Sequence, residues 1–474
     1  MILPSFALIV VPVILLIVIW SVSKVLWITR FTAILLWLQT LVLILVLSSV
    51  LTGAQFQSVL SNDFSIDRLG ALFAVLSQVI VASAMTHAPL FFSCEKQQEV
   101  SSIRDVRVFY SCVTLLMASM TAVFFCNNLG MMWICIEATT LCSAPLVLFH
   151  KNKHSLEATW KYLMVCGVGI AFALLGTMFL VASSQHGAIK DGSLLCTDLM
   201  NNATELHYPL LKLGYLFCLL GYGTKAGMFP LHGWLPDAYA EAPAPASALL
   251  SAGLLNCSLF AIWRISEIVH QSGHGDFSQT IGVWSGVTSI FFASIFLIRQ
   301  HGIKRLLAYS SIESVGLMLT AIGLHSGTLF FILALNLGAA KAALFLLAGN
   351  IVQAGGSKNL SEISGVMTIN PYWSSLFLLA VFALTGVPPF GAFAAEWQML
   401  SSLAQLQQWF PFCIILASFA LSFLAITMHA GKIVSGTPRK QVMTLPPIAS
   451  SIVPACFVIL TLLFGLTAIP KLLW

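Results

Sequence analysis

Apolar runs long enough to cross a lipid bilayer follow one another along nearly the whole chain. A helix needs roughly 17–25 apolar residues to span the ~30 Å hydrocarbon core of a bilayer. Of the 474 residues, 58% are hydrophobic and only 8% are charged, so the stretches between the runs leave no room for a sizeable soluble domain. The chain is therefore predicted to be an all-α integral membrane protein with about fourteen transmembrane helices. We place them at 5–23, 31–51, 69–92, 108–126, 129–149, 157–183, 208–229, 243–265, 279–299, 306–324, 328–353, 371–405 (interrupted), 410–431 and 447–470.

The polar loops between these runs distribute lysine and arginine unevenly. Loops that follow odd-numbered runs contain fourteen of these residues, and loops on the opposite side contain five. Because cytoplasmic loops are enriched in Lys and Arg, both termini are predicted on the non-cytoplasmic side of a cell (inner) membrane. The net charge of +5 then reflects membrane topology, and no basic stripe indicates a nucleic-acid partner.

Motifs for cofactor binding and covalent catalysis are missing from the sequence. The eleven cysteines show no C-x-x-C, C-x-x-C-H or ferredoxin-like spacing. The segment GYGTKAG at 221–227 lacks the spacing of a phosphate-binding loop. We therefore expect no cofactor, no metal ion and no catalytic site in this chain.

Six ionisable side chains fall inside the predicted helices. A charge at the bilayer centre costs roughly 2.5–3.5 kcal/mol on insertion scales, so such a group usually faces the interior of a helix bundle and finds a partner. The first three lie on predicted helices five to seven and the other three on helices ten to twelve. Because this offset of five helices is odd, the two units are expected to be inverted relative to each other. The residues are Glu137, Lys161 and Lys225 in the first unit and Glu313, Lys341 and Glu396 in the second.

Proline interrupts one helix in each unit, close to an ionisable group. Pro230 follows Lys225, and Pro388-Pro389 precedes Glu396. Paired interrupted helices at corresponding positions of two halves are the best sequence indication of an ion site in a transporter. Since a break leaves backbone groups that polar neighbours or water must satisfy, these interruptions are expected to bring water to buried charges. Small movements of Lys225 against a neighbouring carboxylate would then switch it between its protonated and neutral forms.

Some of these polar residues also have simpler interpretations. Lys161 lies four residues after Glu157, so the two could form an interfacial ion pair. Glu313 could mark the cytoplasmic end of its helix, and His232, beside the first break, could relay protons or cap a helix end. The two acidic residues after that break are expected in a solvated cytoplasmic loop; they are Asp237 and Glu241.

Several segments together resemble a known family. They are GTKAGMFPLHGWLPDAYAEAPAPASALLSA from residue 223, WICIEATTL, LEATWKYL, IKRLLAYSSIES and LTGVPPFGAFAAEW. With these segments the chain resembles the antiporter-like membrane subunits of respiratory complex I, Mrp-type cation/proton antiporters and group 4 membrane-bound hydrogenases, and most of all component F of hydrogenase-4. The likeness covers about 108–430 and is most specific in the 223–250 block.

The resemblance implies fourteen helices with two inverted five-helix repeats, two broken helices and a hydrated polar axis at mid-membrane. The N-terminal helices would occupy 1–107, the first repeat 108–268, the second 279–432 and the last helix 447–474. Glu137 and Lys225 resemble the glutamate–lysine pair of the first half-channel, with Lys161 as an intervening lysine. Lys341 resembles the central lysine and Glu396 the terminal exit carboxylate. The possible accessory residues are His232, Asn256 and Glu313.

This sequence departs from the family pattern in the middle of the implied relay. Asn256 stands where many relatives have a lysine or histidine, and Leu333 and Leu337 stand where histidines commonly precede the central lysine. Gly302 occupies the place of a frequent aspartate before the IKR segment. Water could bridge these gaps at a polar, roomy site, and we expect the path to be retained.

The resemblance implies a proton-translocating, antiporter-like membrane subunit of a multi-subunit oxidoreductase of hydrogenase-4, formate-hydrogenlyase or complex I type. Its partners would be other membrane subunits and, indirectly, redox subunits, while the chain itself would hold no redox centre. Three alternatives stay open: a subunit of an Mrp-type antiporter carrying protons or Na⁺, the membrane partner of an inorganic-carbon uptake complex, and a scaffold that conducts nothing.

Overall fold

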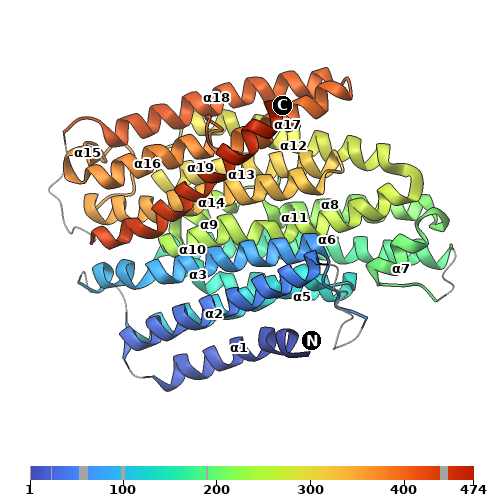
Figure 1. Cartoon of the computed structure of the whole chain (residues 1–474), viewed down its shortest axis with the longest axis horizontal. Helices are drawn as coiled ribbons and strands as arrows, with labels where there is room; N and C mark the ends of the chain where they lie inside the picture. The colour runs from blue at the N-terminus through green and yellow to red at the C-terminus, as the bar shows by residue number, and fades with distance from the viewer. Residues whose placement is uncertain are drawn as a thin grey trace.

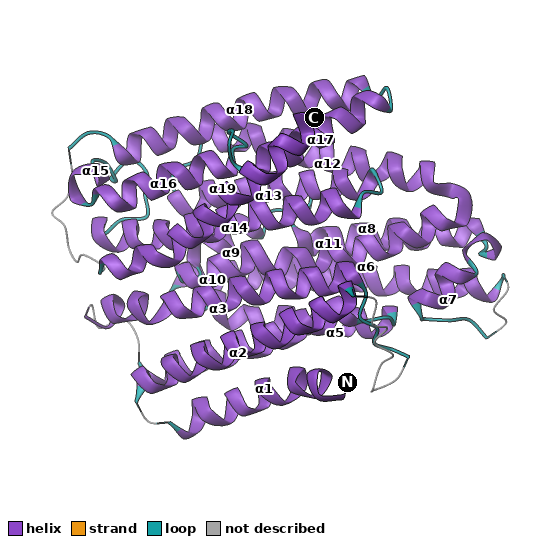
Figure 2. Cartoon of the chain, in the orientation of Figure 1, coloured by secondary structure: helices purple, strands orange, loops and turns teal. Residues whose placement is uncertain are grey.

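The computed structural model describes residues 2–22, 24–52, 62–97, 102–187, 191–437 and 447–473. Almost all of these residues are helical, and the described chain contains isolated β-bridges but no strand (Figure 2). The first part of the chain forms α1 (Ile2–Ser21), α2 (Val25–Leu51), α3 (Arg68–Gln97), α4 (Ile103–Phe125), α5 (Leu129–Val147), α6 (Lys153–Gln185), α7 (Cys196–Asn201), α8 (Tyr208–Ala226) and α9 (Leu235–Glu241). The rest forms α10 (Ala244–Leu249), α11 (Leu255–Val269), α12 (Gly275–Ile298), α13 (Ile303–Gly323), α14 (Gly327–Gly355), α15 (Val366–Ile369), α16 (Pro371–Leu384), α17 (Gly391–Gln405), α18 (Trp409–Val434) and α19 (Ile452–Leu473).

All fourteen predicted runs fall on helices of the structure, which confirms the all-α membrane class. Ten helical stretches of the described chain are long and apolar enough to cross a bilayer, and shorter apolar helices, such as Pro371–Leu384, add to them. Both predicted interruptions are present: α8 and α9 flank the first, and α16 and α17 flank the second. The single run predicted at 243–265 is less regular than expected, since α10 and α11 are joined by a π-helical segment, η2 (Leu250–Leu254).

Small residues allow several helices to approach closely. A Cβ atom on Gly176 of α6 would lie only 2.6 Å from the backbone nitrogen of Cys218 on α8. A Cβ atom on Gly316 of α13 would lie 2.7 Å from the carbonyl oxygen of Gly286 on α12. Helices in lipid associate mainly through such close van der Waals packing, because lipid tails are as apolar as leucine side chains. These glycines therefore explain why α6 packs on α8, and α12 on α13, over much of their length.

The chain order runs across the molecule from one side to the other. In Figure 1 the N-terminal helices α1 and α2 lie at the bottom of the view and α18 at the top. Between them, α10 and the segment that follows it pack against α3 on one side and α14 on the other. The irregular helix α10–η2–α11 thus lies at the centre of the bundle, where α8 of the first broken helix packs against α11.

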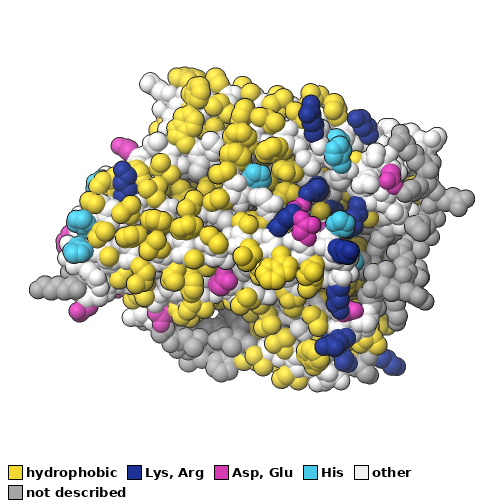
Figure 3. Space-filling view, turned by 180° about the vertical axis from the view of Figure 1, so that it is seen from behind, with side chains coloured by type: hydrophobic (Ala, Val, Ile, Leu, Met, Phe, Trp, Pro, Cys, Tyr) yellow, Lys and Arg dark blue, Asp and Glu magenta, His cyan; other side chains and the backbone are white. Residues whose placement is uncertain are grey.

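Basic side chains gather at one end of the molecule. Figure 3 shows most of the visible Lys and Arg side chains toward its right edge, away from the end at which α1 begins. The face between the ends is dominated by apolar side chains, as expected for a surface in contact with lipid (Figure 3). Three of the basic residues that were counted in the predicted loops lie outside the described residues: Lys190, Arg439 and Lys440.

Candidate functional site

The first broken helix ends one residue after Lys225. Gly227 follows the last helical residue with a φ of +79°, a left-handed conformation that glycine adopts without a steric penalty. The chain then leaves the helical path until α9 begins at Leu235. The indole Nε1 of Trp234 donates a 2.9 Å hydrogen bond to the carbonyl oxygen of Thr224, which also accepts from the backbone N–H of Gly227. The interruption is therefore stabilised from within the chain.

The ammonium group of Lys225 is held by oxygen atoms of α5. Its side chain is fully enclosed, at 1% exposure. Its Nζ donates a 2.9 Å hydrogen bond to the carbonyl oxygen of Ile136 and a second one to the hydroxyl of Thr140. The Thr140 hydroxyl in turn donates to Oε2 of Glu137 at 3.3 Å. The predicted glutamate–lysine pair is therefore present as a chain of hydrogen bonds with a threonine between the two charges.

Sequence reasoning did not select Thr140, although one signal could have identified it. Residues three apart on a helix lie on the same face, so Thr140 was bound to share the face of Glu137. The adjacent hydroxyls extend this polar group, because Ser143 Oγ lies 2.6 Å from the hydroxyl of Tyr162 on α6. Glu137 itself is half-buried, at the edge of the polar group and not at its centre.

Lys161 lies apart from this group, at the more polar end of α6. Its Nζ pairs with Glu157 at 2.6 Å, as the i,i+4 spacing predicted, and with Asp237 at 3.0 Å. Its side chain is 46% exposed. Lys161 borders an open cavity of about 330 Å³ that is lined by charged residues of α6, α9, α13 and the chain after α14. The structure thus places Lys161 in a surface ion-pair cluster.

The acidic residues of α9 were expected to be solvated in a loop, and this expectation was wrong. Asp237 has a side chain only 21% exposed and pairs with both Lys161 of α6 and Arg305 of α13. Glu241 has a side chain 16% exposed and pairs with Lys358 at 3.0 Å. These contacts arise because the break turns α9 back between the two halves of the bundle, where cations from both halves reach it.

Replacing Asp237 with asparagine is expected to weaken this attachment. The change removes the anion between Lys161 and Arg305, which then repel each other across a partly buried site. We expect a loss of about 1–2 kcal/mol in stability, measured as a lower midpoint of thermal unfolding in detergent. Glu157→Gln is the matched control, since Glu157 is 62% exposed and its loss should change stability by less than about 0.5 kcal/mol. Equal midpoints for the two variants would contradict the bridging role of Asp237.

Lys341 lies in the second half of the bundle and points at the irregular central helix. It is 1% exposed, and its Nζ donates a 3.1 Å hydrogen bond to the carbonyl oxygen of Ser251. Ser251 belongs to the π-helical segment η2, where the helical hydrogen-bond pattern is shifted by one residue. Such segments are frequent at functional sites. A local irregularity of α10–η2–α11 thus supplies the acceptor for the second buried lysine.

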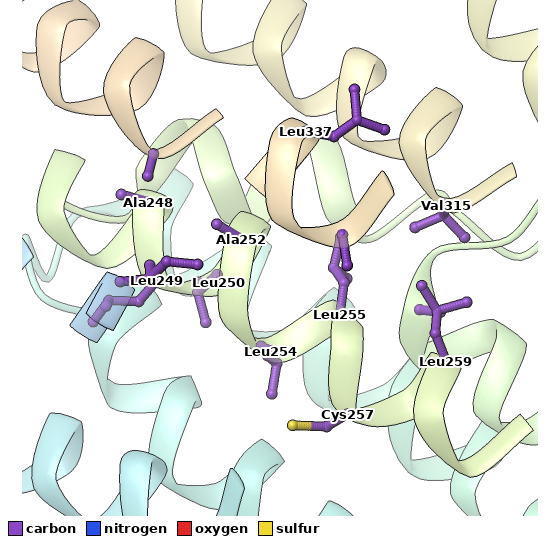
Figure 4. Close-up of a cluster of buried hydrophobic side chains, with 14 of the residues drawn as sticks. Ala248, Leu249, Leu250, Ala252, Leu254, Leu255, Cys257, Leu259, Val315 and Leu337 are labelled. Atoms are coloured by element: carbon purple, nitrogen blue, oxygen red, sulfur yellow. The ribbon is translucent and has the colours of Figure 1, made fainter. Parts of the chain in front are cut away.

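The two leucines that depart from the family pattern add apolar side chains to this region. Leu333 and Leu337 are both fully buried on α14. Leu337 and Leu255 belong to the cluster of apolar side chains between α11, α13 and α14 (Figure 4). The side-chain amide of Asn256 donates a 2.9 Å hydrogen bond to the carbonyl oxygen of Ala252 in the preceding segment η2. Among the described residues, the two buried lysines donate to Ile136, Thr140 and Ser251, and not to Asn256.

The second broken helix holds Glu396 five residues after α17 begins. Glu396 is 9% exposed. Gly386, which has a φ of +62°, lies close to the carboxylate of Glu396. A Cβ atom on Gly386 would overlap the carboxylate of Glu396. The break therefore makes room for the charge directly, by bringing a residue without a side chain against it. Glu313 of α13, 8% exposed, lines the same small cavity as Glu396.

The structure thus brings some of the predicted residues together and keeps others apart. It brings Glu137 and Lys225 together through Thr140, and it brings Glu313 and Glu396 to one cavity. It places Lys341 between the halves and Lys161 in the surface ion-pair cluster. The half-buried imidazole of His232 lies in the first break, with its ring centroid 5.4 Å from that of Phe229. Among the described residues, no cluster of three or more His, Cys, Asp or Glu side chains could hold a metal ion.

Comparisons with known proteins place the chain in a family. Residues 126–424 match the family model described as NADH:quinone oxidoreductase/Mrp antiporter, TM. The chain is 36% identical to the hydrogenase-4 component F homolog of Methylacidiphilum infernorum (isolate V4) over 344 residues, which are 72% of each chain. It is 28% identical to NADH-quinone oxidoreductase subunit N of Desulforudis audaxviator (strain MP104C), over 76% of this chain and 70% of that one.

The fold agrees with a solved structure over the full length. A chain of the Mrp complex from Dietzia sp. DQ12-45-1b superposes with a TM-score of 0.84, at 18% identity, covering 100% of this chain and 96% of that one. The family match spans both broken helices and all six ionisable residues that were predicted inside the helices. This chain is therefore a multi-pass integral membrane protein that belongs to the antiporter-like membrane subunit family shared by complex I, hydrogenase-4 and Mrp antiporters.

Proposed function

We propose that this chain moves protons across the membrane as one subunit of a multi-subunit oxidoreductase of hydrogenase-4 or complex I type. The observation that carries the proposal is the pair of fully enclosed lysines, Lys225 and Lys341, each hydrogen-bonded to a backbone carbonyl oxygen inside the bundle. A lysine in the middle of a membrane protein costs several kcal/mol and usually marks an ion or proton pathway.

The proposed path uses the residues in chain order. Glu137 and Thr140 adjoin Lys225, Lys341 lies at the central irregular helix, and Glu396 ends the path at the second break. Two unit charges about 10 Å apart interact by about 1.7 kcal/mol at an effective dielectric constant of about 20. This energy changes a protonation equilibrium by more than tenfold. A redox or conformational event in a neighbouring subunit that moves Glu137 against Lys225 could therefore displace protons further along the path.

The proposed function also includes a topology for the chain in the membrane. We infer two inverted five-helix units, 108–268 and 279–432, each with its fourth helix broken and its second helix carrying a glutamate. The basic end of the molecule would face the cytoplasm, which leaves both termini on the non-cytoplasmic side of the inner membrane. The likeness to a hydrogenase-4 component F homolog supports redox subunits as indirect partners, whereas the likeness to the Mrp complex concerns the fold alone.

A second candidate function is a non-conducting scaffold, and one observation favours it. Leu333 and Leu337 are buried next to Lys341, where a conducting path needs polar groups or water. The scaffold interpretation predicts that the buried lysines are dispensable for proton movement.

The test is proton flux in the complete complex, purified with its natural neighbouring subunits and reconstituted in vesicles. Lys341→Met should lower the flux at least about tenfold, because methionine fills the same space but carries no proton. Assembly of the complex, followed by size-exclusion chromatography, should be unchanged. Full flux in an assembled Lys341→Met complex would leave the scaffold as the function of this chain.

A further inference from the structure

Two buried carboxyl groups lie at one small cavity between α13, α17 and α18. Glu313 comes from α13 and Glu396 from α17, and each residue is less than 10% exposed. The cavity has a volume of about 20 Å³. A space of this size holds about one water molecule, provided that polar partners line it. Glu313 has no basic partner among the described ion pairs.

Hydroxyl groups complete the polar lining. Ser310 and Ser314 of α13, Thr385 before the second break and Ser422 of α18 all border the cavity. Ser422 is 4% exposed and lies beside Glu313, yet in the described chain its Oγ has no hydrogen-bond partner of good geometry. A buried hydroxyl without a well-aligned partner needs an explanation, and a water molecule shared with the neighbouring carboxyl group provides one. The cavity is thus built to hold something polar next to the two carboxyl groups.

Among the described residues, no lysine, arginine or histidine lines this cavity. The helix α14 contributes Leu337, and Lys341, one turn further along α14, donates its hydrogen bond to the carbonyl oxygen of Ser251. On α18 the nearest titratable side chain toward the basic end, His429, lies 3.2 Å from the carbonyl oxygen of Ile298. Two carboxylates that share a site without a cation cannot both carry their charge at low cost.

The position of Glu313 in the chain gives an independent reason to assign it a role. Glu137 lies on the second helix of the first five-helix unit, and Glu313 lies on the second helix of the second unit. In both units the broken fourth helix carries the partner: Lys225 in the first, Glu396 in the second. The second unit therefore repeats the first, with a carboxyl group in place of the ammonium group.

We propose that Glu313 and Glu396 form a carboxyl pair that holds one proton between them, together with a water molecule in the cavity that they share. The inference rests on the proposed proton translocation and adds a second residue to the terminal site. The proton arriving from the direction of Lys341 protonates one carboxylate, and the other accepts a hydrogen bond from it directly or through the water. Release toward either side then leaves the pair ready for the next proton.

The test compares Glu313→Gln, Glu396→Gln and the double variant in the reconstituted complex, with flux measured across a range of pH. In Glu313→Gln the flux should fall at least about fivefold, and the midpoint of its pH profile should move to lower pH by about half a unit or more, because the like charge is gone. The double variant should conduct no less than Glu396→Gln alone, since the two residues act as one site. Glu205→Gln, on the exposed segment before α8, is the control and should behave as the unsubstituted complex.

Each outcome has a distinct meaning. An unchanged flux and midpoint in Glu313→Gln, alongside a loss in Glu396→Gln, would overturn the carboxyl pair but not the proposed function. Unchanged flux in all variants, including Lys341→Met, would overturn the proposed function itself. A flux that requires Na⁺ and loses this requirement in Glu313→Gln would show a metal-cation site and also overturn the shared proton. Should Glu313→Gln fail to assemble, Glu313→Asp should give a smaller shift of the midpoint in the same direction, and the absence of any shift would refute the pair.

Discussion

Replacing Lys225 with methionine is expected to lower proton flux through the assembled complex about a hundredfold. Methionine fills the enclosed site but cannot donate to Ile136 and Thr140 or carry a proton. Removing one partner of a fully buried ion pair is costly, but Glu137 is only half-buried and keeps its hydrogen bond from Thr140, so the fold should persist. A hundredfold change corresponds to about 2.7 kcal/mol in the barrier to conduction. Flux should be measured in vesicles with a pH-sensitive dye, together with the yield of assembled complex.

The control is Lys212→Met on the same helix. Lys212 is exposed near the beginning of α8, with its Nζ 4.8 Å from the centre of the Phe277 ring. Its loss removes a cation–π contact of about 0.5–1 kcal/mol but no member of the proposed path. Thr140→Val adds a second comparison, because it breaks the link to Glu137 and leaves the bond between Lys225 and Ile136 intact. Equal flux in Lys225→Met and Lys212→Met would refute the assignment of Lys225.

Replacing Gly386 with alanine should lower proton flux at least about tenfold, because it disrupts the site at the second broken helix. The new Cβ would overlap the carboxylate of Glu396, and the φ of +62° at this position is costly for alanine by about 1 kcal/mol. Glu396 would have to leave the cavity that it shares with Glu313. Flux in reconstituted vesicles and thermal unfolding in detergent should both be measured, since the substitution affects both.

A compensating substitution distinguishes displacement of the Glu396 carboxylate from a general loss of structure. Gly386→Ala combined with Glu396→Asp shortens the acidic side chain by one methylene group and restores space next to the new Cβ. Flux should recover in part, while the loss of stability from backbone strain should remain. Gly167→Ala is the neutral control, since a Cβ there meets no atom within 4 Å. Wild-type flux in the single Gly386→Ala variant would contradict a role for this close approach.

Several features of the candidate site followed from the sequence because they depend on local chemistry. A charge in an apolar run must find a partner, so Glu137, Lys225, Lys341 and Glu396 could be selected before any coordinates were known. Proline cannot continue a helix without losing a hydrogen bond, so both breaks were predictable from Pro230 and Pro388-Pro389.

Other features could not be obtained from local sequence. Thr140 was overlooked because its importance depends on where Lys225 arrives from a different helix. The pairing of Asp237 with cations of two helices was missed because it depends on the direction in which α9 leaves the break. The π-helical segment at Leu250–Leu254 gave no recognisable sequence signal, although it supplies the acceptor for Lys341.

The sequence by itself determined that this chain is a helical membrane protein, which side chains lie within its spans and where two helices break. These properties depend on hydropathy and backbone chemistry, which each segment carries without reference to the others. Only the tertiary structure decided how the charged groups meet: Lys225 is linked to Glu137 through Thr140, and Glu396 shares a cavity with Glu313. The physical reason is that a contact between helices depends on their rotation and depth, and these are set by packing across the whole bundle.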